Sequence, residues 1–497
     1  LSLTIDELWN KQIELRQTIE KETQDVLSVY GHEDTAVDSH TTIRQKDVIY
    51  SKLYKSEHMR NAGPYARLKF AMDYWCALWF WPIDKADMLP SRSEFLNDLN
   101  LILVGTISTG KEQAKIGYDQ LSLFDEEDEE LQLIHKINQI QGDDKSEVDL
   151  DSLCMLFSRF DLVRTIANQN KFMHWELEFA DLFAERGGFD LVIGNPPWIR
   201  VEWNEQGILS DHHPIFAVKK MTAVNTTNKR IEVLSNELTR ESYFSEYESI
   251  AGCQNFLNAL QNYPELVGMK ANLYKCFLPQ SWMYSNECSV SAFVHPEGIY
   301  DDPKGGALRE KLYPRLRYHF QFANERKLFP EVDHHTTFSL NVYGGPRMVS
   351  FDTISNLYAA KSIVECYEGE NSNPIPGIKD DKGNWNIIGH PSRIVHVTKK
   401  ELQIFARVFD GSNDWKKSKL PSLHVKEQME VLGQFSNCKK TLATYEHDVY
   451  STTCWNETNA QNDGTLIADV QFPDSVCSAL FVGAYCGLAN PISQTAR

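Results

Sequence analysis

The residues with the clearest chemical potential lie in one segment, FDLVIGNPPW, which runs from Phe189 to Trp198. Pro196 and Pro197 each fix φ and donate no backbone hydrogen bond, so the turn that contains them is rigid. The side-chain oxygen of Asn195 and the carbonyl oxygen of Pro196 remain as acceptors. Together they suit the two N–H groups of an amino group on a planar ring, and they orient its nitrogen as a nucleophile.

Trp198 adds a stacking face beside these acceptors. Stacking of a nucleobase on an aromatic ring contributes roughly 1–3 kcal/mol, and a base must leave its duplex to reach such a turn. The apolar run before the turn, Leu191 to Ile193, predicts a strand covered on both faces of a parallel sheet. Gly194 is expected to let the backbone turn and approach a neighbour closely. Open α/β sheets bind ligands at the carboxyl edge, where this turn is predicted.

The tetrapeptide from Asn195 to Trp198 resembles the catalytic motif of amino-methyltransferases, which move the methyl group of S-adenosylmethionine to adenine N6, cytosine N4 or a glutamine amide. Its flanks, from Trp175 to Phe179 and from Gly188 to Asp190, resemble large bacterial adenine-specific DNA methylases of restriction-modification and phage-defence systems. Without these flanks, an ordinary strand-to-loop turn with two prolines is the competing interpretation.

This resemblance implies a Rossmann-like α/β methyltransferase core, represented here by its later strands. The cofactor it implies is S-adenosylmethionine, and the substrate is adenine N6 of a base flipped out of double-stranded DNA. The resemblance assigns catalysis to four residues, namely Asn195, Pro196, Pro197 and Trp198. It also implies that other subunits of a restriction or defence system are partners. The chemistry needs no metal ion.

Composition sets limits on these expectations. A hydrophobic content of 42% supports folded cores, and no apolar run is long enough to predict a membrane-spanning helix. The 10 cysteines form no CxxC pair, which indicates free thiols in a reducing cytoplasm. The net charge of −19 is awkward for a DNA-binding protein, because phosphate contacts dominate affinity. A local basic face can nevertheless coexist with an acidic total.

Downstream segments are expected to complete the site. Strands are predicted at residues 290–294, 319–322 and 337–343, and the loop from His295 to Tyr300 is expected at the same sheet edge as the tetrapeptide. The family resemblance favours Phe329 over Phe338 as a second ring that stacks on the base, with core packing as the alternative for both. Basic residues that could contact DNA phosphates, or simply be solvated, are Arg200, Lys304, Arg309, Arg315 and Arg317, with Lys219, Lys220, Lys229 and Arg230 in the segment after the tetrapeptide.

The chain is divided here into three regions. Residues 1–185 are expected to be mostly helical, residues 186–345 to form the later half of the catalytic core, and residues 346–497 to form a target-recognition domain. Three weaker signals are interpreted as ordinary structure. The segment from Gly105 to Lys111 resembles a phosphate-binding loop but is followed by Glu112, where a Mg²⁺-binding Ser or Thr is needed. His334 with His335 could bind a metal ion, but a hydrogen-bonded pair at the end of a strand is favoured. The polar residues 32–40 match no zinc pattern, which favours a surface loop.

One requirement is missing from the sequence. A methyltransferase of this kind also needs a glycine-rich turn after its first strand to hold the cofactor, and no convincing one precedes residue 190. We therefore expect the cofactor-binding half upstream of Leu1, and no cofactor-binding residue is assigned. Two alternatives remain open, namely N4-cytosine methylation and a DNA-binding specificity or sensor module with a vestigial methylase turn.

Overall fold

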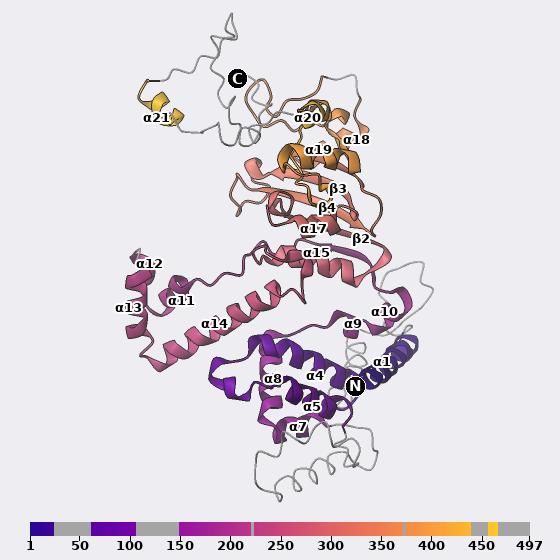
Figure 1. Cartoon of the computed structure of the whole chain (residues 1–497), viewed down its shortest axis with the longest axis vertical. Helices are drawn as coiled ribbons and strands as arrows, with labels where there is room; N and C mark the ends of the chain where they lie inside the picture. The colour runs from indigo at the N-terminus through magenta and orange to yellow at the C-terminus, as the bar shows by residue number, and fades with distance from the viewer. Residues whose placement is uncertain (24–60, 106–148, 220–222, 371–373, 439–455, 466–497) are drawn as a thin grey trace, which may run out of the picture. The chain divides into compact units, whose positions relative to one another are not determined.

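A mixed sheet of six strands positions the predicted turn in this computed structural model (Figure 1). The strands lie in the order β1-β2-β4-β3-β5-β6. Their bounds are β1 Phe189–Gly194, β2 Ser285–Pro296, β3 Leu316–Ala323, β4 Thr337–Gly344, β5 Ser350–Leu357 and β6 Val395–Thr398. The structure describes residues 1–23, 61–105, 149–219, 223–370, 374–438 and 456–465.

The strands are paired in both directions. β1 and β2 are parallel, and Ile193 pairs with Ala292. Their carboxyl ends therefore point to one edge, so the loops after Gly194 and Pro296 share that edge, as predicted. β4 is antiparallel to both β2 and β3, β5 is parallel to β3, and β6 is antiparallel to β5. The α/β class is confirmed, but the sheet is mixed and the described strands do not show a doubly wound arrangement.

One face of the sheet is covered by helices, namely α15 Leu273–Tyr284, α16 Gly298–Asp301, α17 Gly306–Leu312, α19 Lys399–Phe409 and α20 Gln428–Ser436. Leu278 and Leu308 from these helices pack in one core with Phe293 of β2. α19 shows why such a segment is helical. Thr398 and Glu401 form a capping box at its start, and its apolar residues recur at three- and four-residue spacing on the buried side.

The opposite face is covered only in part. α18, Lys361–Glu368, packs there through Cys366 against Phe320 and Ile354 of β3 and β5. On β1, however, Leu191 and Ile193 are 58% and 70% exposed. The prediction that this strand is covered on both faces is therefore wrong for the described structure. The reason is that alternate side chains of β1 point to opposite faces: Val192 packs against the main core, whereas Leu191 and Ile193 belong to no hydrophobic cluster of the described residues.

The glycine that the local geometry requires is Gly188, not Gly194. Gly188 has φ +139°, and a Cβ there would lie 2.5 Å from the carbonyl oxygen of Tyr284. At Gly194 the nearest contact of an added Cβ would be an ordinary 3.6 Å to the Phe293 ring. The chain therefore makes its closest approach before β1, and the turn after β1 depends on its prolines.

All regular structure described before residue 186 is helical. The helices are α1 Ser2–Thr23, α4 Pro64–Ala77, α5 Arg92–Leu103, α7 Leu150–Leu156, α8 Ser158–Asn170, α9 Trp175–Glu178 and α10 Ala180–Arg186. α4, α5, α7 and α8 lie together (Figure 1) and bury Tyr74, Ile102 and Phe160 in one core. Among the described helices, none is both long and apolar enough to cross a membrane.

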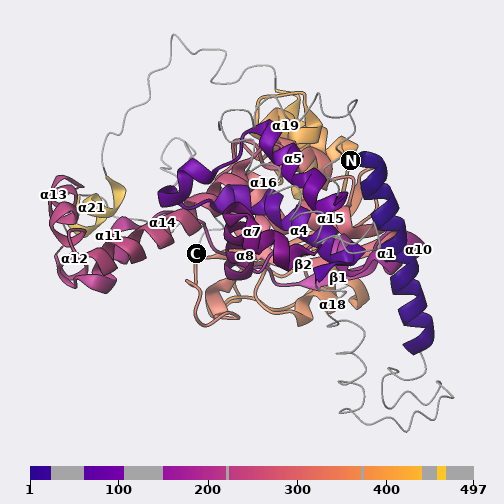
Figure 2. The same ribbon diagram turned by 90° about the horizontal axis from the view of Figure 1, so that it is seen from below.

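The segment after the tetrapeptide forms a helical arm, with bounds α11 Glu205–His212, α12 Ile215–Val218, α13 Ala223–Val233 and α14 Glu237–Asn258. The first three helices gather at one end of α14 (Figures 1 and 2). Glu205 joins them, because one of its carboxylate oxygens accepts hydrogen bonds from Arg230 at 2.6 Å and from Tyr243 at 2.8 Å.

The chain divides into two units, Leu1–Ser436 and Asn437–Arg497. The sheet continues across residue 346, where composition suggested a boundary, since β5 and β6 pair with the earlier strands. Of the second unit, the structure describes little beyond the helix α21, Glu457–Asn462. A recognition role for residues 346–497 remains a prediction.

Candidate active site at the carboxyl edge of the sheet

The predicted turn leaves β1 with the side chain of Asn195 accessible. Asn195 and Pro197 are exposed, and Pro196 between them is buried. Among the described residues, no side chain or backbone group hydrogen-bonds the amide of Asn195. The Asn195 oxygen is therefore available to a ligand, while the buried proline beside it fixes the backbone from which it projects.

Trp198 is anchored to the neighbouring strand. Its Nε1–H donates a hydrogen bond of 3.2 Å to the carbonyl of Val294 in β2. The chain beyond it is held too, because the Leu273 backbone N–H donates to the Ile199 carbonyl at 3.0 Å. Gln254 of the arm donates to the Val201 carbonyl at 2.6 Å. The turn is thus attached to β2, to the start of α15 and to α14.

Three aromatic rings meet beside the turn. The Trp198 ring centroid lies 5.3 Å from that of Phe329 and 5.7 Å from that of Phe338. Phe338 is 4% exposed and stacks on Phe322, so it belongs to the sheet core, whereas Phe329 comes from the loop after β3. The structure therefore brings Trp198 and Phe329 together, as their proposed roles require. The two rings are in direct contact, however, and leave no room for a base between them.

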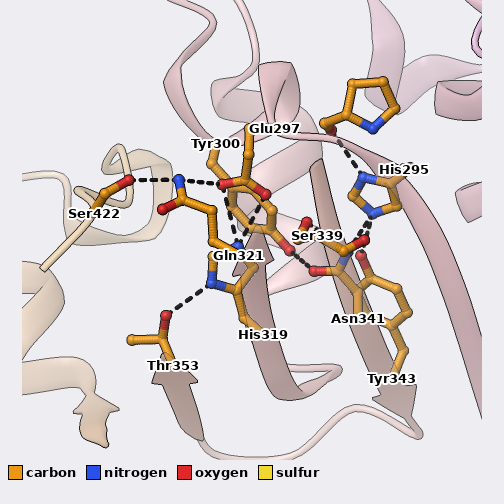
Figure 3. Close-up of polar contacts among 11 residues, drawn as sticks. His295, Glu297, Tyr300, His319, Gln321, Ser339, Asn341, Tyr343, Thr353 and Ser422 are labelled. Atoms are coloured by element: carbon orange, nitrogen blue, oxygen red, sulfur yellow. Dashed lines mark hydrogen bonds and ion pairs between the residues drawn. The ribbon is translucent and has the colours of Figure 1, made fainter. Parts of the chain in front are cut away.

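The end of β2, which includes His295, and the start of α16 are held by a buried hydrogen-bond network (Figure 3). His295 is fully buried, which lowers its pKa to about 4. The neutral ring donates from Nδ1 to the carbonyl of Pro296 at 2.9 Å, so Nε2 must accept. It accepts from the Tyr343 hydroxyl and from the Asn341 amide, each at 2.9 Å. Tyr300 in turn donates to the Asn341 oxygen at 2.6 Å.

Glu297 is the charged member of this network. Its carboxylate lies 3.1 Å from Nε2 of His319 and also accepts from the Gln321 amide at 3.1 Å (Figure 3). Burial alone would raise the pKa of Glu297, but the His319 charge and the hydrogen bonds from His319 and Ser339 lower it. The other ring nitrogen of His319, Nδ1, forms a hydrogen bond of 2.8 Å with the Thr353 hydroxyl. Because these groups are buried and partnered, they can frame the loop but cannot bind a substrate.

The proposed DNA-contacting residues differ in their surroundings. Arg200 and Lys304 are exposed, and among the described residues none forms a hydrogen bond or ion pair with the side chain of either. Arg309 is 2% exposed and donates to the carbonyls of Ile299, Asp302 and Lys417. Its guanidinium therefore joins backbone segments, and a phosphate contact would require it to leave them.

Arg315 and Arg317 are also engaged within the protein. The Arg315 guanidinium lies 4.9 Å above the Trp282 ring, and burial lowers its pKa. Arg317 donates to several backbone carbonyls, among them those of Pro314 and Gly345. A basic run in a sequence does not distinguish an arginine that satisfies buried carbonyls from one that faces solvent. The contacts of Arg315 with Trp282 and of Arg317 with Gly345 join residues far apart in the sequence, and no local pattern indicates them.

Asp333, His334 and His335 form a group that could hold a metal ion, apart from the tetrapeptide in sequence. His335 hydrogen-bonds Asp333 at 3.2 Å, and the ligand atoms of these residues and His334 lie within 4.8 Å of one another. His335 and Asp333 are exposed. Two further segments that the sequence singled out lie largely or wholly outside the described residues, namely the loop from Gly105 to Lys111 and residues 32–40.

A cofactor site is not visible in the described part of the chain. No described strand lies beside β1 on its free edge, and none of the described strands is followed by a Gly-x-Gly turn. The described residues therefore do not provide the donor side of a methyl-transfer site. The free edge of β1 lies directly beside the turn from Asn195 to Trp198, and no described residue is identified as a contact of S-adenosylmethionine.

Comparison with known proteins matches residues 64–236 to the family described as Eco57I restriction-modification methylase. This part of the chain contains the helical region from α4 onward, β1, the tetrapeptide and most of the arm. Among curated proteins, none matches the chain in sequence. The family similarity therefore rests on the segment that contains Asn195 to Trp198.

Solved structures give weak likenesses. A chain of a type I restriction-modification system is 13% identical with a TM-score of 0.21, over 56% of this chain and 46% of that one. The Type ISP enzyme LlaBIII bound to DNA is 12% identical with a TM-score of 0.21, over 51% and 16%. A modification subunit assigned to a type I restriction enzyme of Vibrio vulnificus YJ016 is 12% identical with a TM-score of 0.20, over 47% and 67%. Scores this low do not establish a common fold.

Proposed function

We propose that this chain carries the amino-acceptor side of a DNA methyltransferase site in a restriction-modification system, and that its target is adenine N6. One observation carries the proposal. The accessible amide of Asn195 projects from a turn that two prolines stiffen and that β2, α15 and α14 hold. The match of residues 64–236 to a restriction-modification methylase family supports the reaction class.

In the proposed reaction the turn binds the amino group of a flipped base. The Asn195 side-chain oxygen and the Pro196 carbonyl each accept one N–H bond, which orients the nitrogen lone pair away from the turn. Because the acceptors are fixed beforehand, they need little reorganisation in the transition state. S-adenosylmethionine, when bound, supplies an electrophilic methyl group. Since its site is not visible in the described residues, no residue is given a role toward it.

The proposal also covers the base and the DNA. Trp198 offers one stacking face and Phe329 the other, after the two rings separate. Arg200 and Lys304 are the basic residues free to meet phosphates of double-stranded DNA, while Arg309, Arg315 and Arg317 keep that role only if they leave their present partners. Residues 346–497 are proposed to take part in target recognition.

A second candidate is a DNA-binding specificity or sensor module with a vestigial turn. It is favoured by the lack of a described donor side and by the direct contact of Trp198 with Phe329. The first candidate requires methyl transfer to DNA by the full-length protein, or by this chain together with a separate cofactor-binding subunit. The second requires DNA binding without transfer.

The test of the site is Asn195→Ala in a tritiated-methyl assay on DNA. Removing one preorganised acceptor should lower kcat by about 10²–10³-fold or more. Because Asn195 is exposed, the free energy of unfolding should change by no more than about 0.5 kcal/mol.

A matched control is Asn286→Ala. Asn286 donates to Asp190 at the start of the same strand pair and has no role in the proposed chemistry. Its activity should stay near that of the wild type. Activity of Asn195→Ala equal to that of this control would refute the assignment.

A further inference from the structure

The loop between β3 and β4 is organised around a single buried side chain, that of Asn324, which is 0% exposed. Its Nδ2 donates to the carbonyls of Phe329 and Val332 at 2.9 Å, and to that of Asp333 at 3.4 Å. Its Oδ1 accepts the backbone N–H of Phe329 at 3.0 Å. One amide thus satisfies polar groups along much of the loop from Asn324 to Thr336.

Asn324 holds the backbone of Phe329 at two points. Both its backbone N–H and its carbonyl bond to the amide of Asn324, so the position of its Cα is fixed relative to the end of β3. The backbone N–H of Asn324 donates to the Thr336 carbonyl at 3.0 Å, which closes the loop at its base. The neighbours Leu328 and Pro330 are exposed, so the apolar contacts of this stretch come from the Phe329 ring, which packs against the cluster that contains Phe338.

The ring of Phe329 points to the candidate site. It lies 5.3 Å from the Trp198 ring and 4.9 Å from the Phe338 ring, the latter at 81°. Phe338 belongs to the core and Trp198 is hydrogen-bonded to β2, whereas Phe329 comes from the loop between β3 and β4. Its position therefore depends on what holds that loop.

We propose that Asn324 is a positioning residue, which holds the backbone of Phe329 so that its ring forms the second wall of the base pocket opposite Trp198. This inference rests on the proposed function. Since the two rings touch, a base enters only when they separate. The backbone of Phe329 is fixed at two points, so the two rings separate by rotation of the Phe329 side chain while the loop stays in place. Such rotation is fast for a partly exposed residue.

The decisive experiment is a double-mutant cycle in the methyl-transfer assay, with Asn324→Ala, Phe329→Ala and both together. If Asn324 acts through Phe329, each single variant should lower kcat/KM for DNA by about tenfold, the scale of one lost stacking contact. The double variant should then lose no more than Phe329→Ala alone. Multiplied losses, with the double variant about 100-fold down, would overturn the proposal.

A second readout needs no methylation. Trypsin cuts after Arg326 and Lys327, which lie exposed in the loop. Asn324→Ala should speed cleavage there at least tenfold, while Phe329→Ala should change it little, because the amide of Asn324 still holds the backbone. Equal cleavage of wild type and Asn324→Ala would contradict the anchoring role, even if the protein proves to have no methyltransferase activity.

A matched control separates anchoring from the general loss of an asparagine. Asn262 also donates from a part-buried side chain to a backbone carbonyl, that of Phe256 at 2.9 Å, in the loop after α14. Asn262→Ala should leave both kcat/KM and cleavage after Lys327 unchanged. If wild-type protein transfers no methyl group while Asn324→Ala is still cleaved faster, the proposed function fails and the anchoring of Phe329 stands.

Discussion

The carboxyl ends of the parallel strands β1 and β2 share one edge of the sheet but have opposite chemistry. After β1, Asn195 is exposed, and no described residue hydrogen-bonds its amide. At the end of β2, both nitrogens of His295 are hydrogen-bonded and the ring is fully buried. The difference supports the proposed division of roles, in which the end of β2 supplies a rigid frame and the turn after β1 keeps the Asn195 oxygen for a ligand.

The largest effect on the frame is expected from Asn341→Ala. Asn341 is 0% exposed and joins His295, Ser339 and Tyr300. Truncation leaves several buried polar groups without partners, so the free energy of unfolding should fall by about 3–5 kcal/mol. Denaturant titration measures this loss.

The control for that titration is Asn384→Ala, in an exposed turn where Asn384 donates to Asp380. It should change stability by less than about 0.5 kcal/mol. If Asn341→Ala also lowers the free energy of unfolding by less than about 0.5 kcal/mol, the contrast between the turn after β1 and the buried network at the end of β2 is lost.

The pH dependence of stability tests the same frame. Burial lowers the pKa of His295 from 6.5 to about 4, so only the unfolded chain binds this proton between those values. The stability that the neutral His295 contributes is fully present above pH 6.5. It is lost as the pH falls toward 4, which lowers the free energy of unfolding by about 3 kcal/mol in total. Stability curves for wild type and His295→Gln, measured over this range, should therefore differ in slope, with the wild type steeper. Parallel curves would show that His295 is not buried in its neutral form.

The smallest effects concern DNA binding. Arg200→Ala should weaken binding roughly fivefold at physiological salt and reduce the slope of log K against log salt by about 0.9, the signature of one lost phosphate contact. Arg309→Ala should leave that slope unchanged and instead lower stability, because its guanidinium bonds carbonyls inside the protein. If Arg309→Ala reduces the slope and Arg200→Ala does not, the assignment of exposed and structural arginines is reversed.

The local features of the site could be predicted from sequence, because they depend on nearby residues. The run from Leu191 to Ile193 forms a strand and pairs with β2, as expected, but β2 is longer than the predicted 290–294 and includes His295, which the sequence pattern assigns to a loop. The exposure of Ile193 could not be predicted, since an apolar run does not reveal whether one face of the sheet is covered or both. Nor could the role of Asn324, whose partners are recognisable only once the loop is folded.

The measurement that tests the central claim most directly is the identity of the methylated nucleoside. DNA incubated with the full-length protein and S-adenosylmethionine is digested to nucleosides and separated by mass. An accessible Asn195 in a rigid Asn-Pro-Pro-Trp turn predicts N6-methyladenine, absent when Asn195→Ala replaces the wild type. N4-methylcytosine would contradict the adenine assignment. Unmodified DNA, from protein that still binds both DNA and cofactor, would contradict the methyltransferase function itself.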